Sequence, residues 1–154
     1  MRTSTRRDAA IEEISNRIFF RLFQVANTMH TKGTKALTDL GVTTQQWIVL
    51  GELSRAQSDE GISVNKLSER LFVTRQNLSG MLDRLEREEI VERVTCDEDR
   101  RARRIRLTEK GKAIWASNSA IYGFYDDALK GLTFENRVEL LHWLNQLQKN
   151  MTIL

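Results

Sequence analysis

The sequence contains no proline, and glycine is sparse, with eight residues among 154. Both residues normally interrupt helices, so their scarcity favours long helices. The single cysteine, Cys96, excludes an internal disulfide and a cysteine-rich zinc site. The two histidines, His30 and His142, lie far apart in the sequence and show no metal-ligand spacing. We therefore expect neither a metal nor another cofactor.

Long apolar runs are also absent, since none reaches the roughly 18 residues that indicate a membrane span. The basic N-terminus, MRTSTRRDAAIEEIS, leads into an amphipathic segment rather than the apolar core of a secretory signal. These absences predict a cytoplasmic protein without a membrane partner. The length is sufficient for one domain with a hydrophobic core, and we expect a single domain over residues 1–154.

Net charge is low, at +3, but basic residues are concentrated in one segment. Five arginines lie within the seven residues from Arg100 to Arg106, in the stretch DEDRRARRIRLTEKG (97–111). A local cationic cluster on a nearly neutral chain is typical of a nucleic-acid-binding surface, although most charge runs are solvated loop tips.

Hydrophobic periodicity predicts a mainly helical fold with a minor β component. A helix over 8–32, ending at Gly33, carries apolar side chains at spacings of three and four. Thr43 and Gln46 match a capping box that begins a second helix. Two short helices, capped by Ser63 and Thr74, then meet through a turn at 72–74, which is the spacing of a helix-turn-helix.

Alternating apolar residues on both sides of the arginine cluster predict a β-hairpin. A long helix from Thr108 to about Lys130 and a last helix from Thr133 complete the chain. The expected architecture is a winged helix-turn-helix lobe over 42–108, with helical segments 8–33 and 109–151 at its two ends. Their apolar faces are wider than the central lobe can cover, which favours a partner surface.

Four motifs, in order, resemble the MarR family of bacterial winged helix-turn-helix regulators. VTTQQWIVLGEL resembles the family's second helix, and LSERL with LSGMLDRLE resembles its DNA-binding helices. The hairpin tip resembles the family's wing, and the matching residues are Asp99, Arg100, Arg101, Leu107, Thr108 and Gly111. The resemblance covers roughly residues 40–112. The chain departs from the family at Gly80, where some members carry arginine, and at Glu88–Glu89, where glycine is frequent.

The resemblance implies an obligate homodimer, joined through segments 8–33 and 109–151, on a pseudo-palindromic double-stranded DNA operator. It implies that Arg101 enters the minor groove while the second helix of the motif enters the major groove. We expect Asp99 to orient Arg101 by a charge-assisted bond. The DNA-contact candidates are Arg75, Gln76, Asn77, Ser79 and Arg84 on the helix, and Asp99, Arg100, Arg101 and Arg103 on the wing. For Arg84 the alternatives are a phosphate contact and an ion pair with Asp83 or Glu88.

Members of the family usually respond to small molecules, so the resemblance also implies repression relieved by an effector such as an aromatic acid or its thioester. The candidate pocket residues are Arg21, Asn27, His30, Trp47 and Tyr122. The alternative interpretation of Trp47 and Tyr122 is plain core or interface. A redox role for Cys96 is a further alternative, which we disfavour because the first helix, where family sensors tend to carry their cysteine, has none.

Two rival functions belong to other classes. An enzyme is disfavoured because no nucleophile lies near a plausible base and no glycine-rich phosphate loop is present. A helical scaffold or adaptor that contains a winged domain needs no base-reading side chains, so binding to specific DNA discriminates between it and a regulator.

Overall fold

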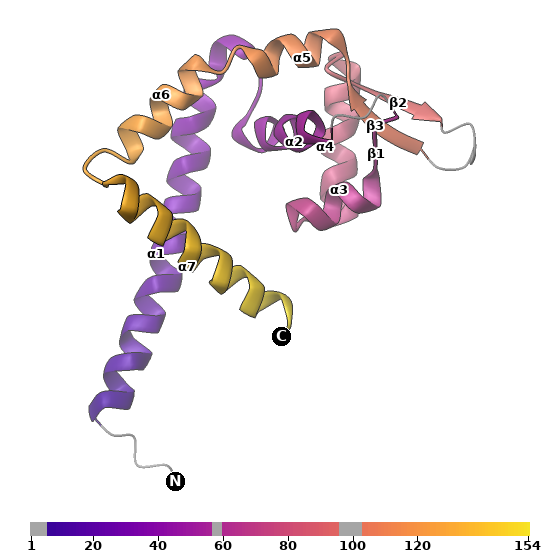
Figure 1. Ribbon diagram of the computed structural model, residues 1–154. Helices are drawn as coiled ribbons and strands as arrows, with labels where there is room; N and C mark the ends of the chain where they lie inside the picture. The colour runs from indigo at the N-terminus through magenta and orange to yellow at the C-terminus, as the bar shows by residue number, and fades with distance from the viewer. Residues whose placement is uncertain (1–5, 57–59, 96–102) are drawn as a thin grey trace. The chain divides into compact units, whose positions relative to one another are not determined.

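The computed structural model describes residues 6–56, 60–95 and 103–154. The chain forms two compact units, Met1–Asn118 and Ser119–Leu154. The first contains α1 (Arg6–Ala36), a 3-10 turn η1 (Thr38–Leu40), α2 (Thr44–Arg55), β1 (Ile62–Ser63), α3 (Val64–Leu71), α4 (Arg75–Arg87), β2 (Val91–Thr95), β3 (Arg103–Leu107) and α5 (Glu109–Ala116). The second contains α6 (Ser119–Ala128) and α7 (Phe134–Thr152), as Figure 1 shows.

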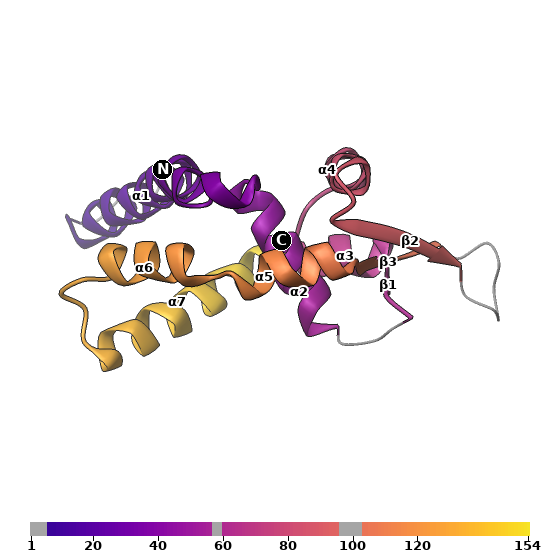
Figure 2. The same ribbon diagram turned by 90° about the horizontal axis from the view of Figure 1, so that it is seen from above.

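The core of the first unit is a winged helix-turn-helix, as the sequence predicts. Helices α3 and α4 meet through a short turn, and β2 and β3 follow them. Together with β1, which precedes α3, these strands form a three-stranded antiparallel sheet of order β1-β3-β2 (Figures 1 and 2). Ile62 pairs with Ile105, and Val91 pairs with Leu107. Most of the fully buried side chains of this unit come from α2, α3, α4 and this sheet, and include Leu50, Leu67, Leu78, Leu82, Leu85 and Ile105. Leu37, just after α1, is fully buried as well.

Hydroxyl side chains begin the helices where the sequence predicts them. The Oγ1 atoms of Thr43, Thr74 and Thr133 and the Oγ of Ser63 each accept a hydrogen bond from the backbone N–H three residues later. Thr43 and Gln46 form the reciprocal capping box, with the Thr43 N–H donating to Gln46 Oε1 at 2.8 Å. These caps satisfy helix N-terminal donors that have no partner inside the helix.

Two expected boundaries are wrong. Gly33 does not end the first helix, since α1 continues to Ala36. Gly33 is buried and is not among the residues with positive φ, so it does not adopt the left-handed conformation that terminates helices. The helix predicted from Thr108 to about Lys130 is interrupted at Ser117, where the Ser117 Oγ donates to the Ala113 carbonyl at 3.0 Å. Short polar side chains compete for backbone groups in this way and weaken helix continuity.

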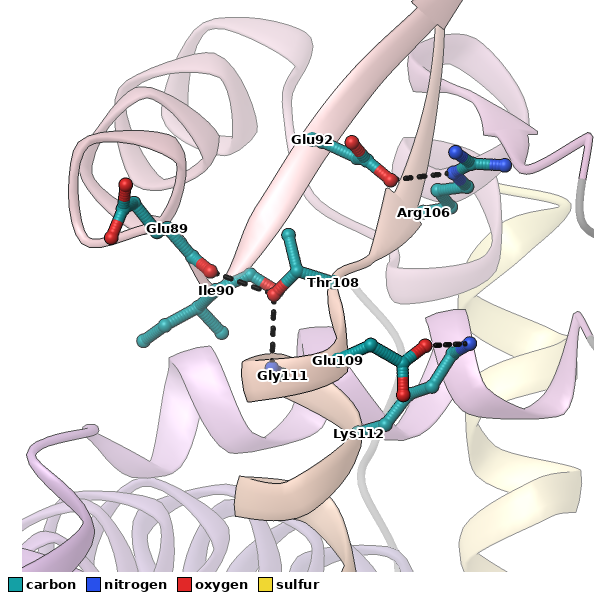
Figure 3. A network of polar contacts seen from close by, with 8 residues as sticks. All are labelled: Glu89, Ile90, Glu92, Arg106, Thr108, Glu109, Gly111 and Lys112. Atoms are coloured by element: carbon teal, nitrogen blue, oxygen red, sulfur yellow. Dashed lines mark hydrogen bonds and ion pairs between the residues drawn. The ribbon is translucent and has the colours of Figure 1, made fainter.

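The start of α5 is attached to the base of the hairpin. Thr108 Oγ1 accepts from the Gly111 N–H at 3.1 Å and donates to the Glu89 carbonyl at 2.7 Å (Figure 3). A Cβ at Gly111 would lie 2.2 Å from the carbonyl oxygen of Ile90, so only glycine fits there. The Leu-Thr-x-x-Gly segment therefore joins the hairpin to the helix that follows it. Glu89, where the family often has glycine, adopts a positive φ of 58°.

Helices α1 and α7 expose apolar side chains to solvent in the single chain. On α1, every residue from Arg6 to Lys32 is exposed except the half-buried Leu22. Its exposed apolar side chains are Ile11, Ile14, Ile18, Phe19, Phe20, Phe23, Val25 and Met29. Helix α7 exposes Phe134, Val138, Leu140, Leu141, Trp143, Leu144 and Met151. None of the described helices has the length and hydropathy needed to cross a membrane.

Candidate nucleic-acid interface

The N-terminal turn of α4 presents three polar side chains to solvent. Arg75, Gln76 and Asn77 are exposed, and Ser79 is half-buried. The Arg75 Nη1 donates to Asn65 Oδ1 on α3 at 3.2 Å, so the two helices of the motif hold this guanidinium between them. The free N–H groups of a helix start favour negative charge, and these side chains can read base edges or grip phosphate.

A salt-bridge cluster ties the hairpin to α4. Arg93, on β2, donates from Nη2 to Asp83 Oδ1 at 2.5 Å and from Nη1 to Glu86 Oε2. The hydrogen bond to Asp83 raises the pKa of the Arg93 guanidinium above its usual value, against the opposing effect of burial, and the Glu86 charge adds to it. The arrangement fixes the hairpin against the face of α4. Neither Arg93 nor Glu86 was a candidate from the sequence.

The predicted ion pair of Arg84 is not formed within the described part of the chain. Asp83 pairs instead with Arg93, and the exposed Arg84 side chain makes no salt bridge with any residue in 6–56, 60–95 or 103–154. Arg84 lines a cavity between α4 and α2. The alternative role of Arg84, a contact to a DNA phosphate, stays a prediction.

The arginine cluster divides into two groups. Arg104 lies 3.5 Å from Glu60, and Arg106 donates to Glu92 Oε1 at 2.7 Å (Figure 3), so both stabilise the sheet. Arg103 is exposed at the start of β3, opposite Thr95. The candidates Asp99, Arg100 and Arg101, with the expected Asp99–Arg101 contact, lie outside the described residues, as does Cys96. In the sequence, Arg104 and Arg106 alternate with the apolar residues Ile105 and Leu107, which is the pattern of a β-strand. This alternation distinguishes them from the arginines predicted at the tip of the hairpin.

A cavity of about 570 Å³ adjoins α4. Its lining comes from α1, from α2 and its N-cap, from the end of α3, from the turn before α4 and from α4 itself, and includes His30, Thr43, Gln45, Ile48, Val49, Leu71, Val73, Asn77, Gly80, Met81 and Arg84. His30 Nδ1 lies 2.8 Å from Thr44 Oγ1, which joins α1 to the start of α2.

Of the five candidate pocket residues, only His30 lines this cavity. Arg21 and Asn27 are exposed on α1. Trp47 is buried and packs against Trp115, with ring centroids 4.5 Å apart, so its interpretation as a core residue is correct. Tyr122 belongs to the second unit and is half exposed. Sequence periodicity did not identify Arg84 and Met81 as cavity residues because that role depends on how α4 packs beside α2.

Comparison with known proteins agrees with this architecture. A sequence model of the MarR family matches residues 40–102. A protein of Rhodopseudomonas palustris named transcriptional activatory protein BadR is 40% identical over 141 residues, which cover 90% of this chain and 81% of that protein. This chain belongs to the MarR family. Its relatives are transcriptional regulators rather than enzymes.

Solved structures of MarR-family regulators share the fold. A MarR/EmrR family transcriptional regulator from Acinetobacter sp. ADP1 has a TM-score of 0.79 at 22% identity, covering 92% of this chain and 99% of its own. The S. aureus MepR–DNA complex has a TM-score of 0.75 at 23% identity, covering 85% and 96%. This MarR-family chain therefore shares its fold with both proteins.

Proposed function

We propose that this MarR-family protein is a sequence-specific DNA-binding transcriptional regulator that acts as a homodimer on a pseudo-palindromic operator. The observation that carries the proposal is the exposed N-terminal turn of α4, with Arg75, Gln76 and Asn77. Later in the same helix, Asp83 and Glu86 bind Arg93 of the hairpin. The solved MepR complex contains DNA, and its fold is similar.

The chemistry of the α4 turn suits base reading. A guanidinium pairs bidentately with guanine, and Gln or Asn pairs with adenine N6 and N7. Arg75 is already oriented by Asn65, which reduces the entropy that it loses on binding. On the hairpin side, Arg103 and the tip arginines Arg100 and Arg101 are proposed to contact the backbone and minor groove, where negative potential attracts guanidinium groups.

A second copy of the chain is proposed to cover the exposed apolar faces of 8–33 and 109–151. Phe23 is 70% exposed and Phe20 is 66% exposed, and a contiguous set of large apolar side chains on a soluble domain is typical of an oligomer interface. Phe23→Glu is expected to give monomers by mass photometry or light scattering and to abolish operator binding. Dimers of unchanged affinity would contradict this interface.

The test of DNA recognition is a binding titration on duplexes selected from random sequence, at two salt concentrations. Gln76→Ala is expected to relax base preference, while Arg101→Ala is expected to lower affinity on all sequences and reduce the salt slope by about one unit. Lys35→Ala, at the exposed end of α1, is the charge-matched control for Arg101→Ala, since it lies outside the wing and outside the segments proposed to join the two copies. Equal affinity of the wild type for selected and scrambled duplexes would favour the scaffold alternative.

We further propose that a small effector, an aromatic acid or its thioester, binds in the cavity beside α4. The cavity is lined by apolar side chains such as Ile48 and Met81, with Arg84 as a cationic partner for a carboxylate, so it suits an aromatic anion. Because Asn77 and Arg84 line the same cavity, an occupant contacts the helix proposed to read DNA. Ile48→Trp, which fills the cavity from α2, is expected to abolish effector-induced release while leaving operator affinity unchanged. Release at wild-type effector concentrations would contradict this site.

The proposed mode is repression relieved by the effector. Activation is the second candidate, since the 40% identical relative is named a transcriptional activatory protein. Transcript levels of the adjoining gene in a deletion strain separate the two modes, because they rise if the protein represses and fall if it activates.

A further inference from the structure

Gly80 differs from the glycines that the fold requires. A Cβ at Gly51 would lie 2.9 Å from the Trp115 ring, and one at Gly61 would lie 2.5 Å from the Ile105 carbonyl oxygen, so a side chain would have to displace the indole at the first position and the backbone at the second. At Gly80, by contrast, a Cβ would meet nothing within 4 Å. Its φ is not positive either, so neither packing nor backbone conformation calls for glycine there.

The position of Gly80 on α4 indicates why glycine occurs there. It lies within α4, between Arg75 and Arg87, where glycine destabilises a helix relative to alanine. It follows Gln76 by four residues and Asn77 by three, which places it one turn further along the same face. Residues that break a local preference without a structural reason tend to occur at functional sites.

We propose that the bare backbone at Gly80 contacts the 5-methyl group of a thymine in the major groove. This inference rests on the proposed function, in which Gln76 and Asn77 reach base edges. DNA bound by Gln76 and Asn77 also lies beside the next turn of α4, where Gly80 is located. Because glycine has no side chain, the DNA can approach the helix backbone there. The Cα methylene of glycine is apolar, and the thymine methyl is the apolar group of the major-groove edge.

A polar base edge in contact with the backbone at Gly80 would be energetically unfavourable. The peptide groups around Gly80 are engaged in the helix and its Cα offers no donor or acceptor, so a polar edge would lose water without gaining a hydrogen bond. A thymine methyl group in contact with Gly80 loses only its hydration, which is unfavourable for an apolar group. Gly80 is therefore a specificity-determining position that selects T·A at one base pair of each half-site.

The experiment is a double-mutant cycle between the protein and the DNA methyl group. Each thymine of the selected operator is replaced in turn by deoxyuridine, which removes only the methyl, and binding of wild type and Gly80→Ala is titrated. For the wild type, one substitution per half-site should weaken binding about fourfold, which corresponds to about 0.8 kcal/mol for one methyl-sized group at 1.4 kcal/mol per factor of ten. The added alanine methyl should weaken binding to the thymine operator about tenfold or more, and the same deoxyuridine substitution should restore it.

The fold is not at risk, because alanine has room at this position and favours the helix, so a thermal melt of Gly80→Ala should show a midpoint no lower than that of the wild type. Gly123→Ala in α6 is the matched control, since its Cβ also meets nothing within 4 Å. Because α6 lies in a segment proposed to join the two copies, the readout is the ratio of thymine to uracil affinities, which should stay at its wild-type value in this variant, and not the absolute affinity. The inference is overturned if Gly80→Ala shows the same thymine-to-uracil effects as the wild type.

Gly80 also lines the cavity beside α4. If Gly80→Ala changes only the effector concentration needed for release, while the ratio of thymine to uracil affinities stays at its wild-type value, the glycine serves the cavity and the thymine contact is refuted. A wild type that selects no sequence from a random pool is a different failure, because it removes the proposed function itself and this inference with it.

Discussion

Arg93→Gln tests the connection between the hairpin and α4. The substitution removes two charge-assisted hydrogen bonds, to Asp83 and Glu86, and leaves a shorter, uncharged but polar side chain. The side chains of Arg93, Asp83 and Glu86 are 27%, 58% and 38% exposed, so solvent screens both pairs. Each bond is therefore worth about 0.5–1 kcal/mol rather than the larger value of a buried pair, and we expect the free energy of unfolding to fall by about 1–2 kcal/mol.

The assay is urea unfolding followed by far-ultraviolet circular dichroism, with the midpoint falling at unchanged slope. The difference from wild type should shrink at 1 M salt, because screening weakens the pairs that the variant lacks. Arg87→Gln is the matched control, since Arg87 lies on α4 and its Nε donates only to the Asp83 backbone carbonyl, at 3.3 Å, within the described chain.

Operator binding supplies the second readout. If the salt bridges fix the hairpin relative to α4, Arg93→Gln should lose the wing's share of the salt slope while keeping the base preference set by Gln76. Loss of stability with an unchanged salt slope would mean that Arg93 stabilises the lobe without positioning the wing. An unfolding midpoint equal to that of wild type would refute the energetic reasoning.

Three further predictions concern the helix starts and the hairpin base. Gly111→Ala should prevent folding of the winged lobe or cost at least 3 kcal/mol, as measured by soluble yield and thermal melting, because its Cβ would lie 2.2 Å from the Ile90 carbonyl oxygen. Thr108→Ala should lower the free energy of unfolding by about 1–2 kcal/mol in urea titrations, whereas Thr108→Ser keeps the capping hydroxyl and most of the stability. The pKa of Glu135 is lowered from its usual 4.5 by hydrogen bonds from its own backbone N–H and from the Thr133 hydroxyl, so its stabilising contribution is present above about pH 4.5 and is lost as pH falls further. Glu135→Gln should therefore melt at a lower temperature than the wild type at pH 7 and at the same temperature as the wild type at pH 3, and an equal deficit at both pH values would exclude this linkage.

Local chemistry explains which parts of the fold were predictable from the sequence. Thr43, Ser63, Thr74 and Thr133 each cap a helix through a hydrogen bond that spans three residues, so the sequence window contains both partners. The interruption at Ser117 was missed because the apolar spacing continues through it and the competing serine hydroxyl gives only a weak local signal.

The candidate site was less accessible from sequence because it depends on tertiary neighbours. Arg93 lies ten residues from Asp83 and seven from Glu86, and their contact requires β2 to fold back along α4. The five arginines of the cluster have the same charge, and only the strand alternation distinguishes Arg106, which pairs with Glu92, from Arg103. The cavity brings together residues from α1, α2 and α4, a combination that no periodicity reveals.

The packing of Trp47 on Trp115 supplies a built-in optical probe. The chain has three tryptophans, and the third, Trp143, lies on α7 and is 64% exposed. Replacing Trp143 with phenylalanine leaves two indoles whose centroids are 4.5 Å apart, one on α2 and one on α5. Rings at that separation couple their transitions, so the near-ultraviolet dichroism of this variant reports whether those two helices remain docked when DNA or an aromatic acid is added.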